Sequence, residues 1–254
     1  MRPLIVVPTF NEVDSLPRVI ELIREHAPDV DVLVVDDNSP DGTGRVADEL
    51  SEQHAEVRVL HRPTKLGLGP AYRAGLGLGM EEGREVLVEM DADLSHPAER
   101  LPALIAATAD ADVVLGSRYV PGGATENWPW HRRALSSGGN RYVRITTGMP
   151  VRDATSGFRA FRRPVLEAIG LLDLASDGYS FQVETLLRAW RAGFHVTEVP
   201  ITFTERRSGA SKISRRIVFE ALWRVAAWGL AGPRRPSGIP ETSVAFAEGQ
   251  ERLG

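Results

Sequence analysis

The sequence contains no cysteine among its 254 residues. Disulfide bonds, thiol nucleophiles and thiolate metal sites are therefore excluded. The six histidines are scattered and none has the spacing of a metal-ligand set, so neutral surface or core roles are the simpler interpretation. No order of serine, histidine and aspartate typical of a hydrolytic triad stands out. Carboxylates, amides and basic side chains remain as the candidates for chemistry.

Long apolar runs are also absent. No run approaches the roughly 20 residues that a membrane-spanning helix needs, so we predict no transmembrane helix. Residues 1–8 enter a strand pattern at once and lack the features of a signal peptide, and we therefore expect a cytoplasmic protein. The net charge is only -4, which gives no overall basic field for nucleic acid, although basic residues become denser after Arg118.

What the chain does contain is a regular alternation of short apolar runs with helical periodicity. The runs cover residues 4–7, 32–35, 57–60, 86–90 and 112–116. Such alternation predicts an α/β fold with a mostly parallel sheet and helices on both faces. Later segments are expected to form helices at 131–147 and 179–192, a strand at 196–203 and a last helix at 213–230. We expect one domain over residues 1–232 and a disordered tail over 233–254, where Pro, Gly, Ser and Glu dominate.

Asp91 and Asp93 follow the fourth apolar run directly. If the backbone stays extended, both side chains point to one side and reach one hard cation or the phosphates that it holds. The alternative is an acidic loop, or a cap for the helix that begins near Pro97. The two residues alone leave these interpretations about equal.

Glycines at positions 67 and 69 suggest a dinucleotide-binding turn. This interpretation fails because Tyr72 occupies the third glycine position and the segment follows the third strand rather than the first. A tight turn is the better explanation, and Lys65 beside it is placed to meet an anion.

Acidic turns in the first half of the chain and basic residues in the second half suit a nucleotide with a charged leaving group. Glu12 and Asp37 can accept hydrogen bonds from a base or ribose, while Asp93 holds a divalent cation against a diphosphate. Arg206 and Lys212 would neutralise the departing diphosphate. For any single arginine, a solvated surface charge is the competing explanation.

Taken together, the motifs resemble those of the polyprenol-phosphate mannosyltransferases, which are members of glycosyltransferase family 2 with the GT-A fold. The resemblance covers about residues 3 to 232. It rests on Pro8-Thr9-Phe10-Asn11-Glu12, Val35-Asp36-Asp37-Asn38-Ser39-Pro40-Asp41, Met90-Asp91-Ala92-Asp93, Gly116-Ser117-Arg118-Tyr119, Glu126-Asn127-Trp128-Pro129 and Ser208-Gly209-Ala210-Ser211-Lys212.

The resemblance implies roles for the matching positions. The implied nucleotide pocket is formed by Pro8, Phe10, Glu12, Val35 and Asp37. Asp91, Ala92 and Asp93 would meet the diphosphate and a Mg2+ or Mn2+ ion, Arg118 and Arg132 the acceptor phosphate, and Arg206 and Lys212 the donor. We expect Asp93 to bind the cation directly and Asp91 to face the sugar or ribose. Ser95 is a second candidate metal ligand, although some relatives carry glutamine at this position, which leaves its mode of ligation open.

The implied reaction transfers mannose from GDP-mannose to a polyprenyl monophosphate with inversion at the anomeric carbon. A phosphate monoester carries about -1.5 to -2 charges at neutral pH, so it needs no general base. Catalysis would rest on Asp93, Arg118 and Arg132 through positioning and metal stabilisation. The alternatives are a UDP-glucose-dependent polyprenyl-phosphate glucosyltransferase and an inactive nucleotide-sugar-binding partner subunit.

A lipid acceptor implies a membrane surface. As a helix, residues 213–230 would carry a continuous apolar face with arginines and aromatic residues opposite, which suits an interfacial helix. Packing of the apolar face against the sheet is at least as common. We expect peripheral attachment at the cytoplasmic face, or docking on a separate integral membrane protein.

Overall fold

A computed structural model describes residues 2–204 and 223–230. The elements before the fifth strand are β1 (Leu4–Thr9), α1 (Leu16–His26), β2 (Asp31–Asp36), α2 (Thr43–Gln53), β3 (Val57–His61), α3 (Leu68–Glu81), β4 (Val86–Glu89), η1 (Ala98–Arg100), α4 (Leu101–Ala106) and η2 (Ala107–Ala109). The later elements are β5 (Val113–Ser117), β6 (Ala124–Glu126), α5 (Trp130–Thr147), β7 (Arg159–Arg162), α6 (Arg163–Ala168), η3 (Leu171–Asp173), α7 (Gly178–Arg191), β8 (Val196–Pro200) and β9 (Thr202–Thr204).

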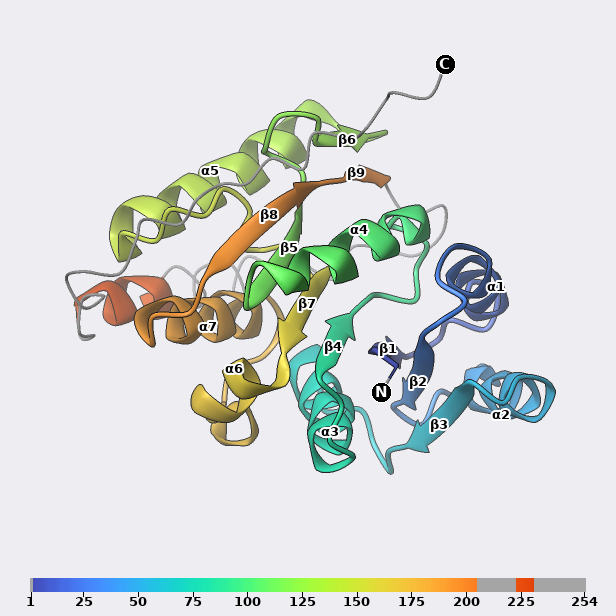
Figure 1. The fold of residues 1–254 in the computed structure, drawn as a ribbon. Helices are drawn as coiled ribbons and strands as arrows, with labels where there is room; N and C mark the ends of the chain where they lie inside the picture. Colours follow the sequence, from blue (N-terminus) through green and yellow to red (C-terminus); the bar gives the residue numbers. More distant parts are fainter. Residues whose placement is uncertain (1, 205–222, 231–254) are drawn as a thin grey trace, which may run out of the picture.

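A seven-stranded sheet with the order β3-β2-β1-β4-β7-β5-β8 forms the centre of the molecule (Figure 1). All its neighbouring strands pair in parallel except β7, which is antiparallel to both β4 and β5. Alternate residues of β1 enter two different cores. Val6 packs in the core that includes α3 and α7, and Val7 packs in the core that includes α1 and α4. The predicted mostly parallel sheet with helices on both faces is therefore confirmed.

The strand predicted at residues 196–203 is wrong as a single element. β8 ends at Pro200 in the main sheet, and β9 pairs with β6 in a separate two-stranded sheet. Strand β7 was not predicted, because its sequence Arg-Ala-Phe-Arg has no apolar run. Buried Arg159 shows why hydrophobicity misses this strand: a guanidinium takes the place of an apolar core residue there.

Residues 223–230 form a helix that packs beside α5 and α7. Val225 is buried in the core that contains α7, and Arg191 Nη2 donates to the carbonyl oxygen of Trp228 at 2.6 Å. Part of the predicted last helix therefore packs against the domain, while Trp223 stays exposed. The remainder of that helix and the predicted tail lie outside the described residues. Within the described ranges, no helix is long and apolar enough to cross a membrane.

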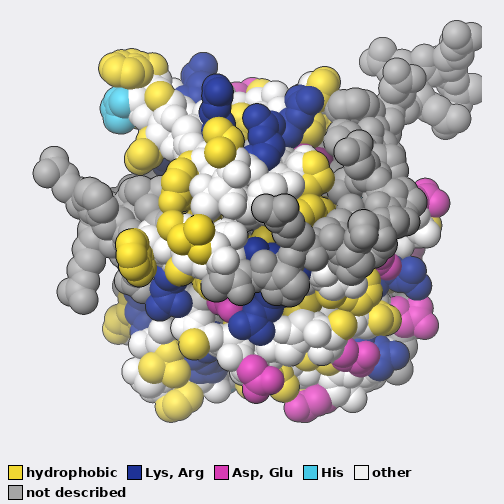
Figure 2. All heavy atoms as spheres, turned by 90° about the vertical axis from the view of Figure 1, so that its left-hand side faces the viewer, with side chains coloured by type: hydrophobic (Ala, Val, Ile, Leu, Met, Phe, Trp, Pro, Cys, Tyr) yellow, Lys and Arg dark blue, Asp and Glu magenta, His cyan; other side chains and the backbone are white. Residues whose placement is uncertain are grey.

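Helix α5 presents a basic and apolar outer face. Trp130, Leu135 and Ile145 are exposed large hydrophobic residues on it. Exposed arginines lie between them, and the helix contains no Asp or Glu. Figure 2 shows basic and hydrophobic side chains gathered on this side of the molecule.

Candidate active site

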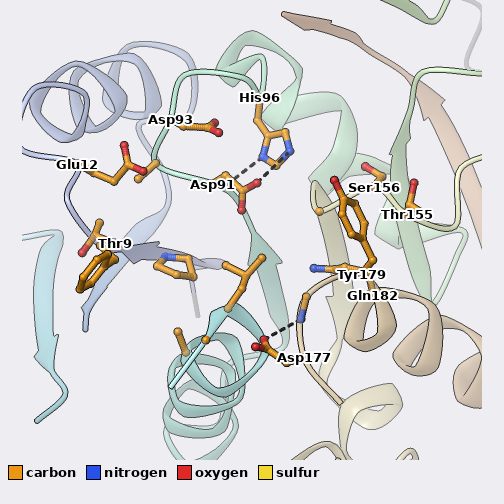
Figure 3. Close-up of a pocket in the computed structure, with 18 of the residues that line it drawn as sticks. Thr9, Glu12, Asp91, Asp93, His96, Thr155, Ser156, Asp177, Tyr179 and Gln182 are labelled. Carbon is orange, nitrogen blue, oxygen red and sulfur yellow. Dashed lines mark hydrogen bonds and ion pairs between the residues drawn. The ribbon is translucent and has the colours of Figure 1, made fainter. Parts of the chain in front are cut away.

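A pocket of about 540 Å³ opens where the carboxyl ends of β1, β2 and β4 meet, and the first turn of α7 faces them across it (Figure 3). Residues from nine parts of the chain line it: Pro8, Thr9, Phe10, Glu12, Asp37, Lys65, Gly67, Leu68, Ala71, Asp91, Ala92, Asp93, His96, Arg118, Arg132, Thr155, Ser156, Gly157, Asp177, Gly178, Tyr179, Gln182 and Phe203. The carboxyl ends of parallel strands are the expected ligand site of such a sheet. Polar turns far apart in sequence thus converge on one cavity.

One end of the pocket contains four of the five predicted nucleotide-binding residues, Pro8, Phe10, Glu12 and Asp37. Lys65 Nζ lies 3.7 Å from the centre of the Phe10 ring, which places a cation and an aromatic surface together. Asp37 is buried, and this burial raises the pKa of its carboxyl group. Arg62 Nη1 lies 2.8 Å from Asp37 Oδ1 and acts in the opposite direction. Although their contact lacks hydrogen-bond geometry, its short distance makes it an ion pair.

Asp36 and Asp37 have different environments although they are adjacent. Asp36 Oδ1 accepts from the hydroxyl groups of Thr9 at 3.0 Å and Ser39 at 2.6 Å, so it fixes the turn after β2. Asp37 lines the pocket instead. Val35, assigned to the nucleotide on the resemblance, is fully buried in the core below and is not among the pocket-lining residues.

Asp91 and Asp93 both line the pocket, but not through extended backbone. Strand β4 ends at Glu89, and the chain bends over residues 92–94, where Leu94 has a φ of 63°. Tyr72 Oη donates to Asp91 Oδ1 at 2.9 Å, and the backbone N–H of Asp91 donates to His96 Nδ1 at 3.0 Å. Burial, and then the charge of Asp91, raise the pKa of Tyr72 well above its ordinary value, so it remains a donor at neutral pH.

The acidic pair fits a hard divalent cation whose remaining ligands come from a bound diphosphate. Across the described residues, no group of three or more His, Cys, Asp or Glu side chains is arranged to hold a metal ion. Magnesium-type sites commonly use one or two carboxylates together with substrate phosphates, which agrees with this donor set. Ser95 donates to Asp93 Oδ1 from its backbone N–H at 3.0 Å and from Oγ at 2.5 Å. Ser95 thus orients the carboxylate, and its assignment as a metal ligand stays a prediction.

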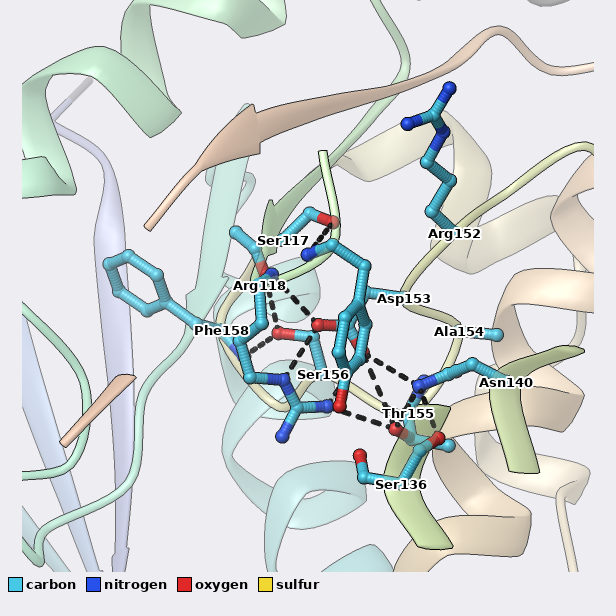
Figure 4. Close-up of polar contacts among 12 residues, drawn as sticks. Ser117, Arg118, Ser136, Asn140, Arg152, Asp153, Ala154, Thr155, Ser156 and Phe158 are labelled. Carbon is cyan, nitrogen blue, oxygen red and sulfur yellow. Dashed lines mark hydrogen bonds and ion pairs between the residues drawn. The ribbon is translucent and has the colours of Figure 1, made fainter. Parts of the chain in front are cut away.

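Arg118 reaches the pocket from a buried polar network (Figure 4). Its Nε and Nη2 donate to the two carboxylate oxygens of Asp153 at 2.7 and 2.6 Å, and Asp153 is fully buried. Asn140 Nδ2 donates to Asp153 Oδ1 at 3.2 Å, and Glu198 Oε1 accepts from the Asp153 N–H at 2.9 Å. The guanidinium group of Arg118 therefore has a fixed orientation.

Aromatic rings surround the two predicted acceptor arginines. The guanidinium carbon of Arg132 lies 4.4 Å from the centre of the Trp128 ring, and that of Arg118 lies 5.4 Å from the same centre. Phe203 places a further ring 5.3 Å from Arg118. Cation–π contacts of this kind hold guanidinium groups without using their N–H groups. At Arg118, Asp153 engages Nε and Nη2, so Nη1 is the nitrogen that can turn to an anion.

The glycines at positions 67 and 69 make room for Asp177, the residue that caps α7. Asp177 Oδ1 accepts from the N–H of Gly69 at 2.6 Å and from that of Gly178 at 2.7 Å. A Cβ on Gly67 would lie 2.0 Å from Asp177 Oδ2, and Gly67 has a φ of +113°. These glycines therefore allow the start of α3, in which Gly69 lies, to approach the start of α7, and the predicted tight turn stays a prediction.

Residues 4–170 match the family model described as "Glycosyl transferase family 2". The chain belongs to glycosyltransferase family 2. It is 50% identical over 233 residues to a polyprenol monophosphomannose synthase of Mycolicibacterium smegmatis, covering 91% of this chain and 88% of that protein. It is 52% identical over 231 residues to an undecaprenyl-phosphate mannosyltransferase of Micrococcus luteus, covering 91% and 95%.

Among solved structures, the fold resembles that of glucosyl-3-phosphoglycerate synthase from Mycobacterium tuberculosis in complex with Mn2+, UDP-glucose and phosphoglyceric acid. The TM-score is 0.64 at 19% identity, with 88% of this chain and 79% of that chain covered. This likeness concerns the fold, and it confirms the GT-A-like architecture of this family 2 glycosyltransferase. The resemblance drawn from the motifs is confirmed as well.

Several pocket residues of this glycosyltransferase were not predicted as site residues. His96 is one, and its Nε2 lies 3.8 Å from Asp91 Oδ2, although scattered histidines gave no reason to single it out. Tyr179 and Gln182 enter from the first turn of α7, whose apolar residues marked it as a core helix. Thr155, Ser156 and Gly157 also line the pocket. The sequence offered one signal for them, since they belong to a polar turn that contains several hydroxyl groups. Arg206 and Lys212 lie outside the described residues, and their roles remain predictions.

Proposed function

We propose that this family 2 glycosyltransferase transfers mannose from GDP-mannose to a polyprenyl monophosphate with inversion at the anomeric carbon. The observation that carries the proposal is that carboxylates and arginines line the same pocket. Asp91 and Asp93 provide an end suited to a metal-bound diphosphate, and Arg118 and Arg132 provide an end suited to a second phosphate. The named activities of relatives at 50% and 52% identity support the choice of mannose and of a polyprenyl acceptor.

The chemistry needs positioning more than proton transfer. An acceptor phosphate is already ionised at neutral pH, so its oxygen can attack without a general base. Fixed guanidinium groups hold that oxygen in line with the bond to the leaving diphosphate, which lowers the entropic part of the barrier. A Mg2+ or Mn2+ ion held by Asp93 would stabilise the negative charge of the departing GDP. Arg206 and Lys212 are assigned to the same diphosphate.

The outer face of α5 is proposed as the surface that meets the membrane. Exposed Trp130 and Ile145 flank exposed Arg141 and Arg144 along the helix, and aromatic and aliphatic residues beside basic ones suit an anionic lipid surface. Trp223 is exposed on the neighbouring helix. For an enzyme that takes its acceptor from the bilayer we expect peripheral attachment, and we propose the cytoplasmic face, with or without an integral membrane partner.

The transfer assay tests the proposed reaction directly. Radiolabelled mannose from GDP-mannose is expected in an organic-extractable lipid when polyprenyl phosphate and a divalent cation are present. Asp93→Ala and Lys212→Ala should each abolish most of the transfer, whereas Asp14→Ala, at an exposed position outside the pocket, should not. Full activity of Asp93→Ala would contradict the metal assignment.

Donor choice is tested separately by thermal shift with GDP-mannose and with UDP-glucose, each with Mg2+ or Mn2+. Stabilisation by UDP-glucose alone would refute the choice of mannose. Binding of GDP-mannose without any transfer to lipid would instead indicate a partner subunit without activity.

Vesicle co-sedimentation tests the α5 surface. Each basic residue near an anionic membrane contributes about 1 kcal/mol, so Arg141→Glu and Arg144→Glu should each weaken binding about fivefold or more. Arg100→Glu is the matched control, because Arg100 is exposed beside α4 on the other side of the sheet. Equal losses for all three variants would argue against α5 as the contact surface.

A further inference from the structure

One wall of the pocket has no assigned ligand. It is formed by residues 155–157 and by Tyr179 and Gln182 at the start of α7 (Figure 3). On the proposed function, the anomeric carbon lies between the leaving diphosphate and the incoming phosphate. The sugar ring therefore occupies the space between the Asp91–Asp93 end and the Arg118 end, where this wall is available to its hydroxyl groups.

Gln182 is the residue of this wall whose polar atoms are buried without a hydrogen bond. It is only 3% exposed, yet neither its Nε2 nor its Oε1 has a hydrogen-bond partner among the described residues. Figure 3 shows its side chain directed into the cavity. Of the described pocket-lining residues, Asp37 also has a buried oxygen without a hydrogen bond, but Arg62 accounts for that oxygen at 2.8 Å.

The nearby carboxyl group of Glu89 does not satisfy this amide. Burial raises the pKa of Glu89 to about 7, with Arg159 and then Gln182 acting against the rise. The Gln182 amide acts on the pKa of Glu89 as a hydrogen-bond donor, although the contact between the two side chains does not reach full hydrogen-bond geometry. A single hydrogen bond to Glu89 would engage only one end of the amide: a carboxylate can accept from Nε2, and a protonated carboxyl group can donate to Oε1. The other end of the amide would remain available to a ligand in the cavity.

The backbone that carries Gln182 is fixed by a buried arginine. Arg159 Nη1 donates to the carbonyl oxygen of Gln182 at 2.6 Å. The Nε and Nη2 of the same guanidinium donate to the carbonyl oxygens of Ser156 at 2.6 Å and Ala154 at 2.7 Å. Both halves of the wall are therefore held together before a ligand arrives.

We infer that the side-chain amide of Gln182 binds hydroxyl groups of the transferred hexose. An amide presents one acceptor and one donor group, which matches hydroxyl groups that both donate and accept. A buried polar group without a partner costs free energy, and a sugar hydroxyl that completes its hydrogen bonds recovers that cost. Gln182 thus distinguishes the nucleotide sugar from the bare nucleotide.

The test compares binding of GDP and of GDP-mannose by isothermal titration, with Mg2+ and without acceptor lipid. Gln182→Met keeps the length of the side chain and removes both polar atoms. We expect it to weaken GDP-mannose binding about tenfold, equivalent to about 1.4 kcal/mol, and to leave GDP binding within about twofold. The melting temperature should stay the same or rise, because an unsatisfied amide has been removed from a buried position.

Thr197→Val is the matched control. Thr197 lies on β8, is buried, has an Oγ1 without a hydrogen bond among the described residues, and does not line the pocket. It should leave the affinities for both ligands unchanged. Equal weakening of GDP and GDP-mannose by Gln182→Met, or a loss of sugar binding in Thr197→Val, would refute the inference. A wild-type protein that binds UDP-glucose but not GDP-mannose would instead refute the proposed donor.

Discussion

Replacing Asp153 by asparagine tests whether the buried ion pair with Arg118 organises the acceptor end of the pocket. The Arg118 side chain is 7% exposed and that of Asp153 is 0% exposed, so neither charge is solvated in the folded protein. Asp153→Asn keeps the shape but leaves the guanidinium without a carboxylate. Breaking a buried pair in this way costs about 3–5 kcal/mol.

For a chain of this size, 1 kcal/mol corresponds to about 2–4 °C, so the melting temperature should fall by about 6–20 °C. Circular dichroism during heating measures the fall. Adding Arg118→Met to Asp153→Asn should restore at least half of the lost stability, because the uncompensated charge is then gone.

Glu82→Gln provides a comparison at a pair of similar geometry in a more exposed position. Arg58 donates to both oxygens of Glu82, at 2.6 and 2.9 Å, but the two side chains are 40% and 25% exposed. This change should cost no more than about 1 kcal/mol. If Asp153→Asn costs as little as Glu82→Gln, or if the double variant is as unstable as the sum of its single changes, the pair does not organise this end of the pocket.

Three other predictions concern Gly67, the buried Glu89 and the bound metal. Gly67→Ala should destabilise the protein by about 1–3 kcal/mol through backbone strain. The clash of the new Cβ with Asp177 should add to this loss. Gly83→Ala, with a φ of +74° and open space around it, should show only the backbone part in chemical denaturation. The pKa of Glu89 is raised to about 7, so the folded state binds the Glu89 proton more tightly than the unfolded state does. The contribution of Glu89 to the free energy of unfolding therefore falls as pH rises from about 4.5 to 7. Glu89→Gln should therefore gain at most about 3 kcal/mol relative to wild type at pH 8 and little at pH 4.5, and an equal gain at both values would contradict the assignment. Removing divalent cations with EDTA should weaken GDP binding to the wild type but much less to Asp93→Ala, as measured by titration calorimetry.

The sequence predicted the half of the site that lies directly after strands. Phe10, Asp37 and Asp91 follow apolar runs, and the rule for parallel sheets brings the ends of such runs together. Asp177 and Gln182 escaped this rule because they belong to the start of a helix. The approach of Asp177 to Gly69 depends on how α7 packs on the sheet, which local patterns do not specify.

Predictions from local patterns also failed where polar groups replaced apolar ones. Arg159 is a fully buried strand residue whose charge is satisfied by carbonyl oxygens, so no hydrophobic alternation marked β7. The single strand predicted over 196–203 ignored Pro200, which cannot donate a backbone hydrogen bond to a continuing ladder. Extended backbone was expected to place Asp91 and Asp93 together, but the chain bends over residues 92–94. Tyr72 and His96 make hydrogen bonds to Asp91 in that arrangement.

The place of β7 in the sheet limits which strands can pair while the chain is still being synthesised. β4 and β5 follow each other along the chain, yet each has β7 as its neighbour, and β7 is synthesised more than 40 residues after β5. A nascent chain ending near residue 120 can pair β3, β2, β1 and β4, but the outer edge of β4 stays open and β5 has no partner strand among the elements already made. Open strand edges are where newly made chains associate wrongly. The emergence of residues 159–162 is thus the step that joins β5 to β4, before β8 adds the edge strand, and we expect chaperone capture of the nascent chain to fall sharply after it.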